Sequence, residues 1–394
     1  MSGGTFAATE AVELAVLERS GFVESRHIGS AVVVSPSGEV VRTLGNPDAP
    51  IFPRSCLKPF QALAVLNSGV ELNAVQTVLA TASHAATPEH VAVVESILAK
   101  AGLTTDALQC PDDWPGDSAA RDELVRGHQH RASIYMNCSG KHAAMLLACV
   151  VNGWPIDTYL DLDHPLQQRI VETIESLTGE RIAATGTDGC GAPVHAISLT
   201  GLARGIGRIT GASAESVPAA SVLTASVLTA SVLTASVLTA SVLTASVLAN
   251  GWAIDGPGRA NTLCIDSLAV FSKLGAEGVM VMSTTPATPL PDASAADGAA
   301  ASGAAAGAPA AGSGAPATES PAGTTAGTTV AIKMLDGSLR AATLVGLTLL
   351  VQAGALDERA VDALLPALDL TVYGGTSPVG SIRLGAAVPV AAIS

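Results

Sequence analysis

The sequence predicts an α+β fold in which a mixed β-sheet is flanked by helices. Two strand-like runs rich in β-branched residues lie on either side of a short turn in residues 27–45. Apolar segments of helical length, which end at Gly or Asn-Gly, follow along the chain. The composition, with 48% hydrophobic and 14% charged residues, is sufficient for a sizeable core. Strands and helices in this order favour a sheet packed against helices.

The hairpin is predicted by HIGSAVVVSPSGEVVRTLG, in which Pro36, Ser37 and Gly38 form the turn. Three helices are predicted where apolar segments end at Gly or Asn-Gly: residues 59–69, 88–102 and 142–153. Near the end of the chain, TVAIKMLDG alternates like a strand followed by a turn, and a helix-like run spans Leu339 to Gln352. These last elements are too few for an independent core.

Two segments differ in composition from the rest. From residue 220 to 248 the chain repeats ASVLT, and a five-residue period gives neither a helix nor a strand an amphipathic face. We interpret this repeat as an insertion in a surface helix or loop, and a self-associating β-prone patch is the alternative. Residues 286–328 are nearly all Ala, Gly, Pro, Ser and Thr, which predicts a disordered linker. Residues 1–285 and 329–394 are therefore expected to form a single domain.

Charge and cysteine content exclude several classes of protein. The net charge is −14, with 20 Lys and Arg against 34 Asp and Glu, so a nucleic acid or an anionic membrane surface would be repelled. No apolar stretch reaches membrane-spanning length without polar interruption, and the first twenty residues lack the pattern of a secretory signal. Six dispersed cysteines in such a chain favour reduced thiols over disulfides. We therefore expect a cytoplasmic protein.

The stretch FPRSCLKPF contains a hydroxyl, Ser55, three positions ahead of an amine, Lys58. Pro59 is tolerated at the start of a helix but not inside one, so Ser55 to Lys58 are expected to form a tight lead-in turn. Positions i and i+3 eclipse in such a turn, which would bring the hydroxyl and the amine to one side. A lysine can accept a serine proton only if burial lowers its pKa. A helix cap with an exposed lysine is the alternative.

A second serine, Ser83, follows the apolar run VQTVLATAS, which would deliver it to a cleft. The next helix has its own start signal, with Thr87 as N-cap and Pro88 as first residue, whatever the role of Ser83. His84 and His90 are expected to be surface or cap residues rather than metal ligands.

Other candidates lie at turns. Cys138 and Lys141 repeat the i, i+3 spacing just before a helix, and Cys190 lies in a Gly-rich turn beside Asp188. Two thiolates can hold zinc, but the spacing is not that of a structural zinc site, and buried free cysteines are the alternative. Lys273 ends a short apolar strand, where an exposed lysine would be ordinary.

Taken together, these stretches are much more specific than any one of them. The chain contains, in order, VESRHIGSAVVV, FPRSCLKPFQAL, ASH followed by TPEHV, NCSGKH, GTDGCGAPV, GPGR and SKLGAEG. This series resembles the type II L-asparaginases of the rhizobial, thermolabile kind. The resemblance covers residues 22–210 and 250–285 well and residues 328–394 loosely, and it leaves out the repeat and the linker.

The resemblance implies that the chain hydrolyses the side-chain amide of L-asparagine to L-aspartate and ammonia. It implies a fold similar to that of serine β-lactamases and glutaminases. Two Ser-Lys pairs would carry the reaction, which correspond here to Ser55 with Lys58 and to Ser83 with Lys273. Acyl transfer from the amide to a serine, with a neutral lysine as base, is the mechanism we expect.

By the same resemblance, one zinc ion would be held by Cys138, Lys141 and Cys190. A lysine ligand must be neutral, so metal binding and a low pKa would reinforce each other at Lys141. The family also uses residues corresponding to Arg54, His142 and Asp188 in or around the pocket. The sequence itself does not indicate an oligomeric state, and we expect a homodimer by the resemblance.

One segment departs from the family pattern. Where family members usually have Ser-His-Ser-Gly-Glu, this chain has Ser83-His-Ala-Ala-Thr87. The loss of the glycine restricts the turn, and the loss of the carboxylate removes a charge that would meet a substrate ammonium. A catalytically impaired relative that serves as a binding or scaffold protein is therefore one alternative. A β-lactamase-like hydrolase is the other, since Lys273-Leu-Gly275 matches its Lys-x-Gly strand, although the chain has no Ser-Asp-Asn element.

Overall fold

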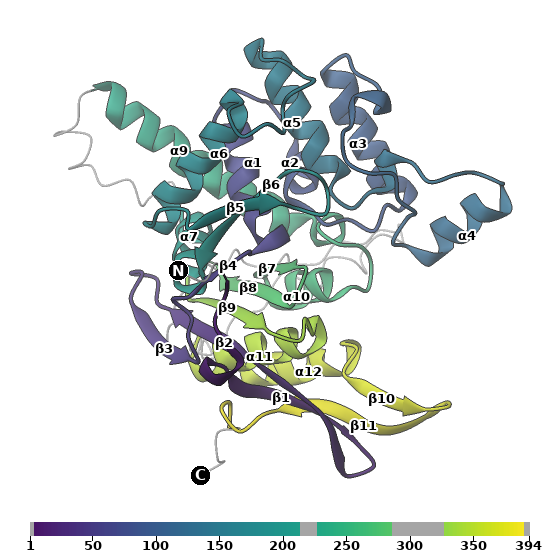
Figure 1. Cartoon of the computed structure of the whole chain (residues 1–394), viewed down its shortest axis with the longest axis vertical. Helices are drawn as coiled ribbons and strands as arrows, with labels where there is room; N and C mark the ends of the chain where they lie inside the picture. Colours follow the sequence, from purple (N-terminus) through teal and green to yellow (C-terminus); the bar gives the residue numbers. More distant parts are fainter. Residues whose placement is uncertain (1–3, 213–226, 286–326, 390–394) are drawn as a thin grey trace, which may run out of the picture.

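An antiparallel β-sheet runs between two groups of helices in the computed structural model, which describes residues 4–212, 227–285 and 327–389 (Figure 1). Within these residues the sheet has eight strands. They are β1 (Val12–Arg19), β2 (Phe22–Val34), β3 (Val40–Leu44), β7 (Val270–Gly275), β8 (Val279–Thr284), β9 (Thr329–Met334), β10 (Thr371–Gly374) and β11 (Ser377–Leu384). The strand order is β10-β11-β1-β2-β9-β8-β7, and β3 pairs with β2.

The α+β class and the helices beside the sheet are confirmed, and the arrangement is consistent with a β-lactamase-like fold. One detail differs from the prediction. All strand pairs of the described residues are antiparallel, so the sheet is not mixed. The physical reason is that short turns join β1 to β2, β2 to β3, β7 to β8 and β10 to β11, and a short turn reverses the chain direction.

The central strand β2 shows how alternation builds two cores. Val32 and Val34 belong to the core on one side of the sheet, and Ala31 and Val33 to the core on the other. All four are almost fully buried, because successive side chains of a strand point to opposite faces. The predicted hairpin is confirmed, since β2 pairs with β3 up to Val34 opposite Val40.

Helices cover the two faces separately (Figure 1). The larger core lies under α1, α2, α3, α5, α6 and α7, and the smaller core under α11 and α12. The helices are α1 (Lys58–Leu66), α2 (Ala74–Thr81), α3 (Pro88–Lys100), α4 (Ser118–Arg126), α5 (Ser139–Asn152), α6 (Pro165–Thr178), α7 (Leu199–Thr210), α9 (Val227–Ala249), α10 (Ala260–Leu268), α11 (Leu339–Gln352) and α12 (Glu358–Leu364). The predicted helices at 59–69, 88–102, 142–153 and 339–352 are thus confirmed as α1, α3, α5 and α11.

Short elements complete the fold. A small second sheet has the order β4-β6-β5 and lies beside the larger one. Its strands are β4 (Pro50–Ile51), β5 (Ala184–Thr187) and β6 (Pro193–Ser198). The 3-10 turns are η1 (Ala8–Glu10), η2 (Arg54–Leu57), η3 (Thr105–Ala107), η4 (Ser133–Tyr135), η6 (Gly251–Ala253) and η8 (Leu365–Ala367). The turn η2 follows β4 directly and leads into α1.

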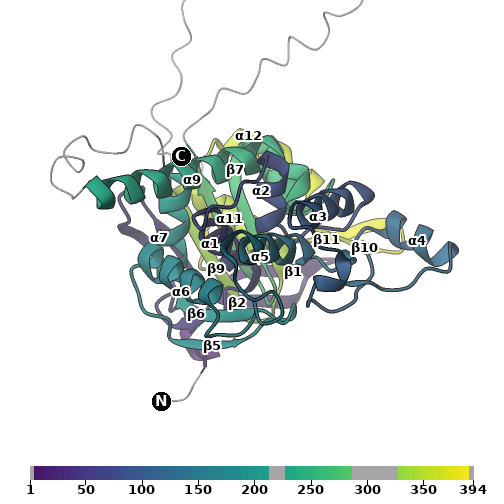
Figure 2. The ribbon, with the colours of Figure 1, turned by 90° about the horizontal axis from the view of Figure 1, so that it is seen from above.

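The ASVLT repeat continues into α9, which lies along one side of the helical layer (Figure 2). Leu243 and Val247, in the last turns of this helix, are fully buried, and the hydroxyl of Thr244 donates to Ile209 O at 3.2 Å. One face of these turns therefore packs against α2 and α7, whereas Leu238 and Val242 remain exposed, and the insertion in a surface helix or loop stays a prediction. No helix in the described part of the chain is long and apolar enough to cross a membrane. Most of the predicted linker, residues 286–326, lies outside the described residues.

The contact between α2 and α5 depends on Gly140. A Cβ atom at this position would lie 2.6 Å from the backbone oxygen of Leu79, so α5 would have to move away from α2. We expect Gly140→Ala to lower the free energy of unfolding by about 1–3 kcal/mol, although alanine is the better helix former. Urea denaturation would measure this change.

The matched control is Gly127→Ala at the end of α4, where a Cβ would meet no atom closer than 3.4 Å. An unchanged or higher unfolding midpoint for Gly140→Ala would contradict the close approach of these two helices.

Candidate active site

Ser83 is presented by the end of α2. The helix starts at a capping box, in which the Asn73 side chain accepts from the Gln76 N–H at 2.9 Å and the Gln76 side chain accepts from the Asn73 N–H at 3.1 Å. It ends where Ala82 becomes extended. The N–H of Ser83 then donates to Ile254 O at 2.9 Å, which ties this serine to a segment far away in the sequence. The apolar run thus delivers Ser83 to a pocket.

Two lysine amines bind the hydroxyl oxygen of Ser83. Lys58 Nζ donates to Ser83 Oγ at 3.0 Å, and Lys273 Nζ donates to it at 2.8 Å. Each amine has one further acceptor, Ala82 O at 2.5 Å for Lys58 and Leu274 O at 2.9 Å for Lys273. Both lysines are almost completely buried. Helix α1 and strand β7 therefore hold two amines against one serine.

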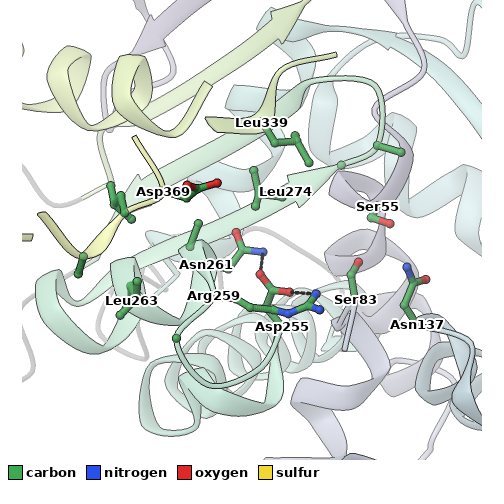
Figure 3. Close-up of a pocket in the computed structure, with 16 residues that line it drawn as sticks. Ser55, Ser83, Asn137, Asp255, Arg259, Asn261, Leu263, Leu274, Leu339 and Asp369 are labelled. Atoms are coloured by element: carbon green, nitrogen blue, oxygen red, sulfur yellow. Dashed lines mark hydrogen bonds and ion pairs between the residues drawn. The ribbon is translucent and has the colours of Figure 1, made fainter. Parts of the chain in front are cut away.

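The tight turn predicted a contact between Ser55 and Lys58, but the structure does not pair them. Within the described residues no hydrogen bond joins the two side chains, because the Lys58 side chain reaches across to Ser83 and Ala82 O. A buried ammonium needs acceptors, and the end of α2 provides them. Ser55 lies in η2 and lines the same pocket as Ser83, and Figure 3 shows the two serines next to each other.

Burial changes the acid–base chemistry of Lys273. The side chain is fully buried, so the exposed strand-end lysine considered from the sequence is wrong. Burial disfavours the ammonium form, and the neighbouring charge of Lys58 disfavours it further, which together lower the pKa of Lys273 to about 8. A large fraction of Lys273 is therefore neutral near pH 8. A neutral amine at 2.8 Å can accept the proton of Ser83.

A cluster of two thiols and one amine adjoins these lysines. Cys138 precedes α5, Lys141 lies in the first turn of that helix, and Lys141 Nζ donates to Cys190 Sγ at 3.1 Å. A hydrogen bond from Cys190 lowers the pKa of the Cys138 thiol well below its usual value, with help from Lys58 and Lys141. Burial by itself would lower the pKa of Lys141, but the two thiols outweigh burial and raise it. The lowered pKa of Cys138 and the raised pKa of Lys141 favour a buried thiolate beside a buried ammonium group.

All six cysteines are free and buried, and their reduced state stays a prediction. The donor set of Cys138, Lys141 and Cys190 fits zinc, which binds sulfur and nitrogen ligands and in open sites has three protein ligands. Within the described residues no three His, Cys, Asp or Glu side chains are grouped as a metal site, so Lys141 would have to be the third ligand. Nearby, the buried His142 side chain interacts with the Cys190 thiol.

None of the three residues expected to bind substrate lines the pocket of Ser83. His142 Nδ1 forms a hydrogen bond of 2.7 Å with the Tyr159 hydroxyl, and burial lowers the pKa of His142 to about 4. Arg54 Nε donates to Asp188 Oδ1 at 2.7 Å. Burial would raise the pKa of Asp188, but hydrogen bonds from Arg54 and the Gly189 N–H lower it. Arg54 and Asp188 thus pair with each other and connect η2 to the loop of Cys190.

The segment that departs from the family pattern caps a helix. Thr87 is the N-cap of α3 with Pro88 at the first position, as predicted, and its hydroxyl lies 2.8 Å from His90 Nδ1. His90 is a cap residue, as expected, because its side chain completes the capping box of α3, and it is buried. His84 is also buried, which corrects its expected place on the surface, and its Nε2 lies 3.0 Å from Ser139 Oγ. The side chain at position 87 therefore belongs to the helix cap.

The pocket in front of Ser83 has a volume of about 540 Å³ (Figure 3). Its polar lining includes Ser55 and Asn137, and also Asp255, Arg259 and Asn261, to which we assigned no role from the sequence. The one sequence signal at this place was the motif GPGR. The sequence shows Asp255 before this turn and Arg259 at its end, but it does not show that both side chains line the same pocket.

A comparison with known protein families gives a match. The family described as L-asparaginase II matches residues 15–384, which is nearly the whole chain. None of the curated proteins matches the chain. The match includes both lysines, both serines and the two cysteines of the site. The chain therefore belongs to the L-asparaginase II family and is an enzyme of that class.

Proposed function

We propose that this enzyme hydrolyses the side-chain amide of L-asparagine through an acyl-enzyme on Ser83, with Lys273 as the general base. One observation carries the proposal: two buried lysine amines donate hydrogen bonds to the same serine oxygen. Family membership supports asparagine as the substrate. Ser83 is favoured over Ser55 as the nucleophile because no lysine binds the Ser55 hydroxyl in the described residues.

In the first half of the reaction, neutral Lys273 accepts the Ser83 proton while Oγ attacks the amide carbon. The resulting ammonium then gives this proton to the amide nitrogen, so that ammonia leaves and an aspartyl ester remains. The N–H of Ser83 donates to Ile254 O and is not free to stabilise the oxyanion. The second amine, Lys58, provides the positive charge beside the reacting oxygen.

In the second half, Lys273 is neutral again and accepts a proton from water. The hydroxide attacks the ester carbon, Ser83 leaves as the alkoxide, and Lys273 returns the proton to it. The side chain leaves as a carboxylic acid that gives its proton to the released ammonia, so the products are L-aspartate, ammonium and the free enzyme, and atoms and charges balance. Ser55, which lies next to Ser83 in the pocket lining, is placed to hydrogen bond with this water or with the substrate.

Ammonia release tests the proposal directly. The protein would be incubated with L-asparagine, with L-glutamine and with a chromogenic β-lactam. Turnover of L-asparagine is expected. Opening of the β-lactam without ammonia release would support a β-lactamase-like hydrolase instead. Binding of L-asparagine without turnover of any of the three would support a relative that has kept the pocket but lost the reaction.

We also propose that Cys138, Lys141 and Cys190 bind one zinc ion per chain. Such an ion would supply a positive charge that orients an oxygen or amine of the substrate. The support is the donor set itself, two thiols and an amine gathered in one buried place.

Removal of either thiol is expected to abolish zinc binding, because two protein ligands do not complete a stable site. Metal content of purified Cys138→Ala and Cys190→Ala would be compared with that of the unchanged protein, with Cys149→Ala as the matched control, since Cys149 is a buried thiol in the same helix. Equal zinc content in all four proteins would remove the metal from the proposal.

A further inference from the structure

The pocket in front of Ser83 carries opposite charges close to the serine. Three charged side chains line this pocket, namely Asp255, Arg259 and Asp369. Figure 3 shows Asp369 beyond Leu274 on the far side, whereas Asp255 and Arg259 lie next to Ser83. Asp369 is largely exposed and pairs with Arg340. Apart from the amines of Lys58 and Lys273, the pocket lining therefore places one carboxylate and one guanidinium beside Ser83.

The backbone holds this pair in place. Ser83 N donates to the carbonyl of Ile254, the residue before Asp255, so the carboxylate cannot move far from the serine. On the other side, Arg259 Nη2 donates to Gly116 O at 2.7 Å. The turn between the two charges is close to the Ser83 loop, since a Cβ on Gly256 would lie 2.9 Å from the Cβ of Ala85.

The two charges are not saturated by each other. Arg259 Nη1 lies 3.3 Å from Asp255 Oδ1, a single long contact rather than the bidentate pair that arginine forms with a carboxylate. Asn261 Nδ2 donates to the other oxygen of Asp255 at 3.2 Å. Asp255 is only 7% exposed, and a buried carboxylate with two long hydrogen bonds has acceptor capacity left. Arg259 likewise has N–H groups that bind no acceptor in the described part of the chain, and its side chain is 42% exposed.

We propose that Asp255 binds the α-ammonium group of the substrate and Arg259 binds its α-carboxylate. The inference rests on the proposed function, because it names what holds the rest of the molecule while the side-chain amide lies at Ser83. The α-ammonium group of an amino acid can pair with the Asp255 carboxylate, and its α-carboxylate can pair with the Arg259 guanidinium. Two shorter ion pairs with the substrate can then replace the long contact between Arg259 and Asp255. The pocket would then select L-α-amino acid amides over simple amides.

This assignment accounts for the carboxylate missing at position 87. The Thr87 hydroxyl contacts His90 in the N-terminal cap of α3. The helix is therefore capped without an acidic side chain at position 87. Asp255 places a carboxylate beside Ser83 from another segment. The change to Thr87 therefore leaves the pocket with a group for the substrate ammonium.

The test measures binding in the Ser83→Ala protein, which cannot form the ester and so holds its ligand unchanged. Calorimetry would compare L-asparagine with two analogues. Succinamic acid lacks the α-ammonium group, and β-alaninamide lacks the α-carboxylate. L-Asparagine is expected to bind at least about 10-fold more tightly than either analogue, because a hydrogen bond to a charged group contributes roughly 1.5–3 kcal/mol.

Single substitutions then assign each charge. Asp255→Asn is expected to weaken binding of L-asparagine by about 10- to 100-fold and to leave succinamic acid within about twofold. Arg259→Gln is expected to do the same for L-asparagine and to leave β-alaninamide within about twofold. Matched controls are Asp163→Asn and Arg383→Gln, which are exposed and lie outside the pocket lining. Neither control should change any of the three affinities.

The outcomes separate this inference from the proposed function. If Asp255→Asn or Arg259→Gln weakens all three ligands equally, or weakens none, the pair is structural and the inference is overturned. If L-asparagine binds with the expected pattern but the protein with Ser83 intact releases no ammonia, the inference stands and the proposed function fails. If ammonia is released but the substitutions do not affect the three ligands as expected, the proposed function stands and this inference is overturned.

Discussion

Ser83→Ala is expected to lower kcat for ammonia release from L-asparagine by roughly 10⁴- to 10⁶-fold, as the loss of a serine nucleophile does elsewhere. The reason is that alanine removes the oxygen atom that both lysine amines bind. KM should change little, because the pocket keeps its charged lining. Steady-state ammonia release with a coupled assay would measure both constants.

Ser55→Ala is the matched comparison, since it removes a hydroxyl from the same pocket. We expect a smaller loss of about 10- to 100-fold, the size of one lost hydrogen bond to a charged or reacting group. The opposite ranking, with Ser55→Ala the more damaging change, would make Ser55 the nucleophile. Equal activity of the unchanged protein and Ser83→Ala would mean that this serine does not take part in the reaction.

Local sequence patterns predicted the helices and strands better than they predicted which strands pair with each other. The hairpin, the helices and the cap at Thr87 follow from residues close together in the sequence, and the structure contains them. The antiparallel order of the sheet depends on pairings such as β2 with β9, about 300 positions apart, which no local pattern reports. Pairing over that distance is decided by packing of the whole chain.

The same limit applies to the site. The spacing of Ser55 and Lys58 predicted a pair, but the ammonium found its acceptors at the end of α2 instead. A buried charge takes the best acceptors within reach of its side chain, and these were 24 and 25 positions away. The motif GPGR did not reveal that Asp255 and Arg259 lie beside Ser83, because the turn around it is folded onto a loop from another part of the chain.

Lys273→Met is expected to lower kcat/KM by about 10²- to 10⁴-fold, the usual contribution of a general base. Methionine fills a volume similar to that of the buried lysine side chain but cannot accept a proton. Lys100→Met is the matched control, since Lys100 is exposed at the end of α3. That variant should keep full activity.

The pH profile distinguishes a base from a lysine that only packs. The pKa of Lys273 is lowered to about 8, mainly by burial and next by the charge of Lys58. Below that value the fraction of neutral amine falls about tenfold per pH unit, so kcat/KM of the unchanged enzyme should rise with pH and level off above pH 8. The residual activity of Lys273→Met should lack this rise. If the variant keeps the same inflection near pH 8, another group is the base, and Lys58, the second amine on Ser83, becomes the candidate, because it is the remaining nitrogen within hydrogen-bonding distance of the attacking oxygen in the described residues.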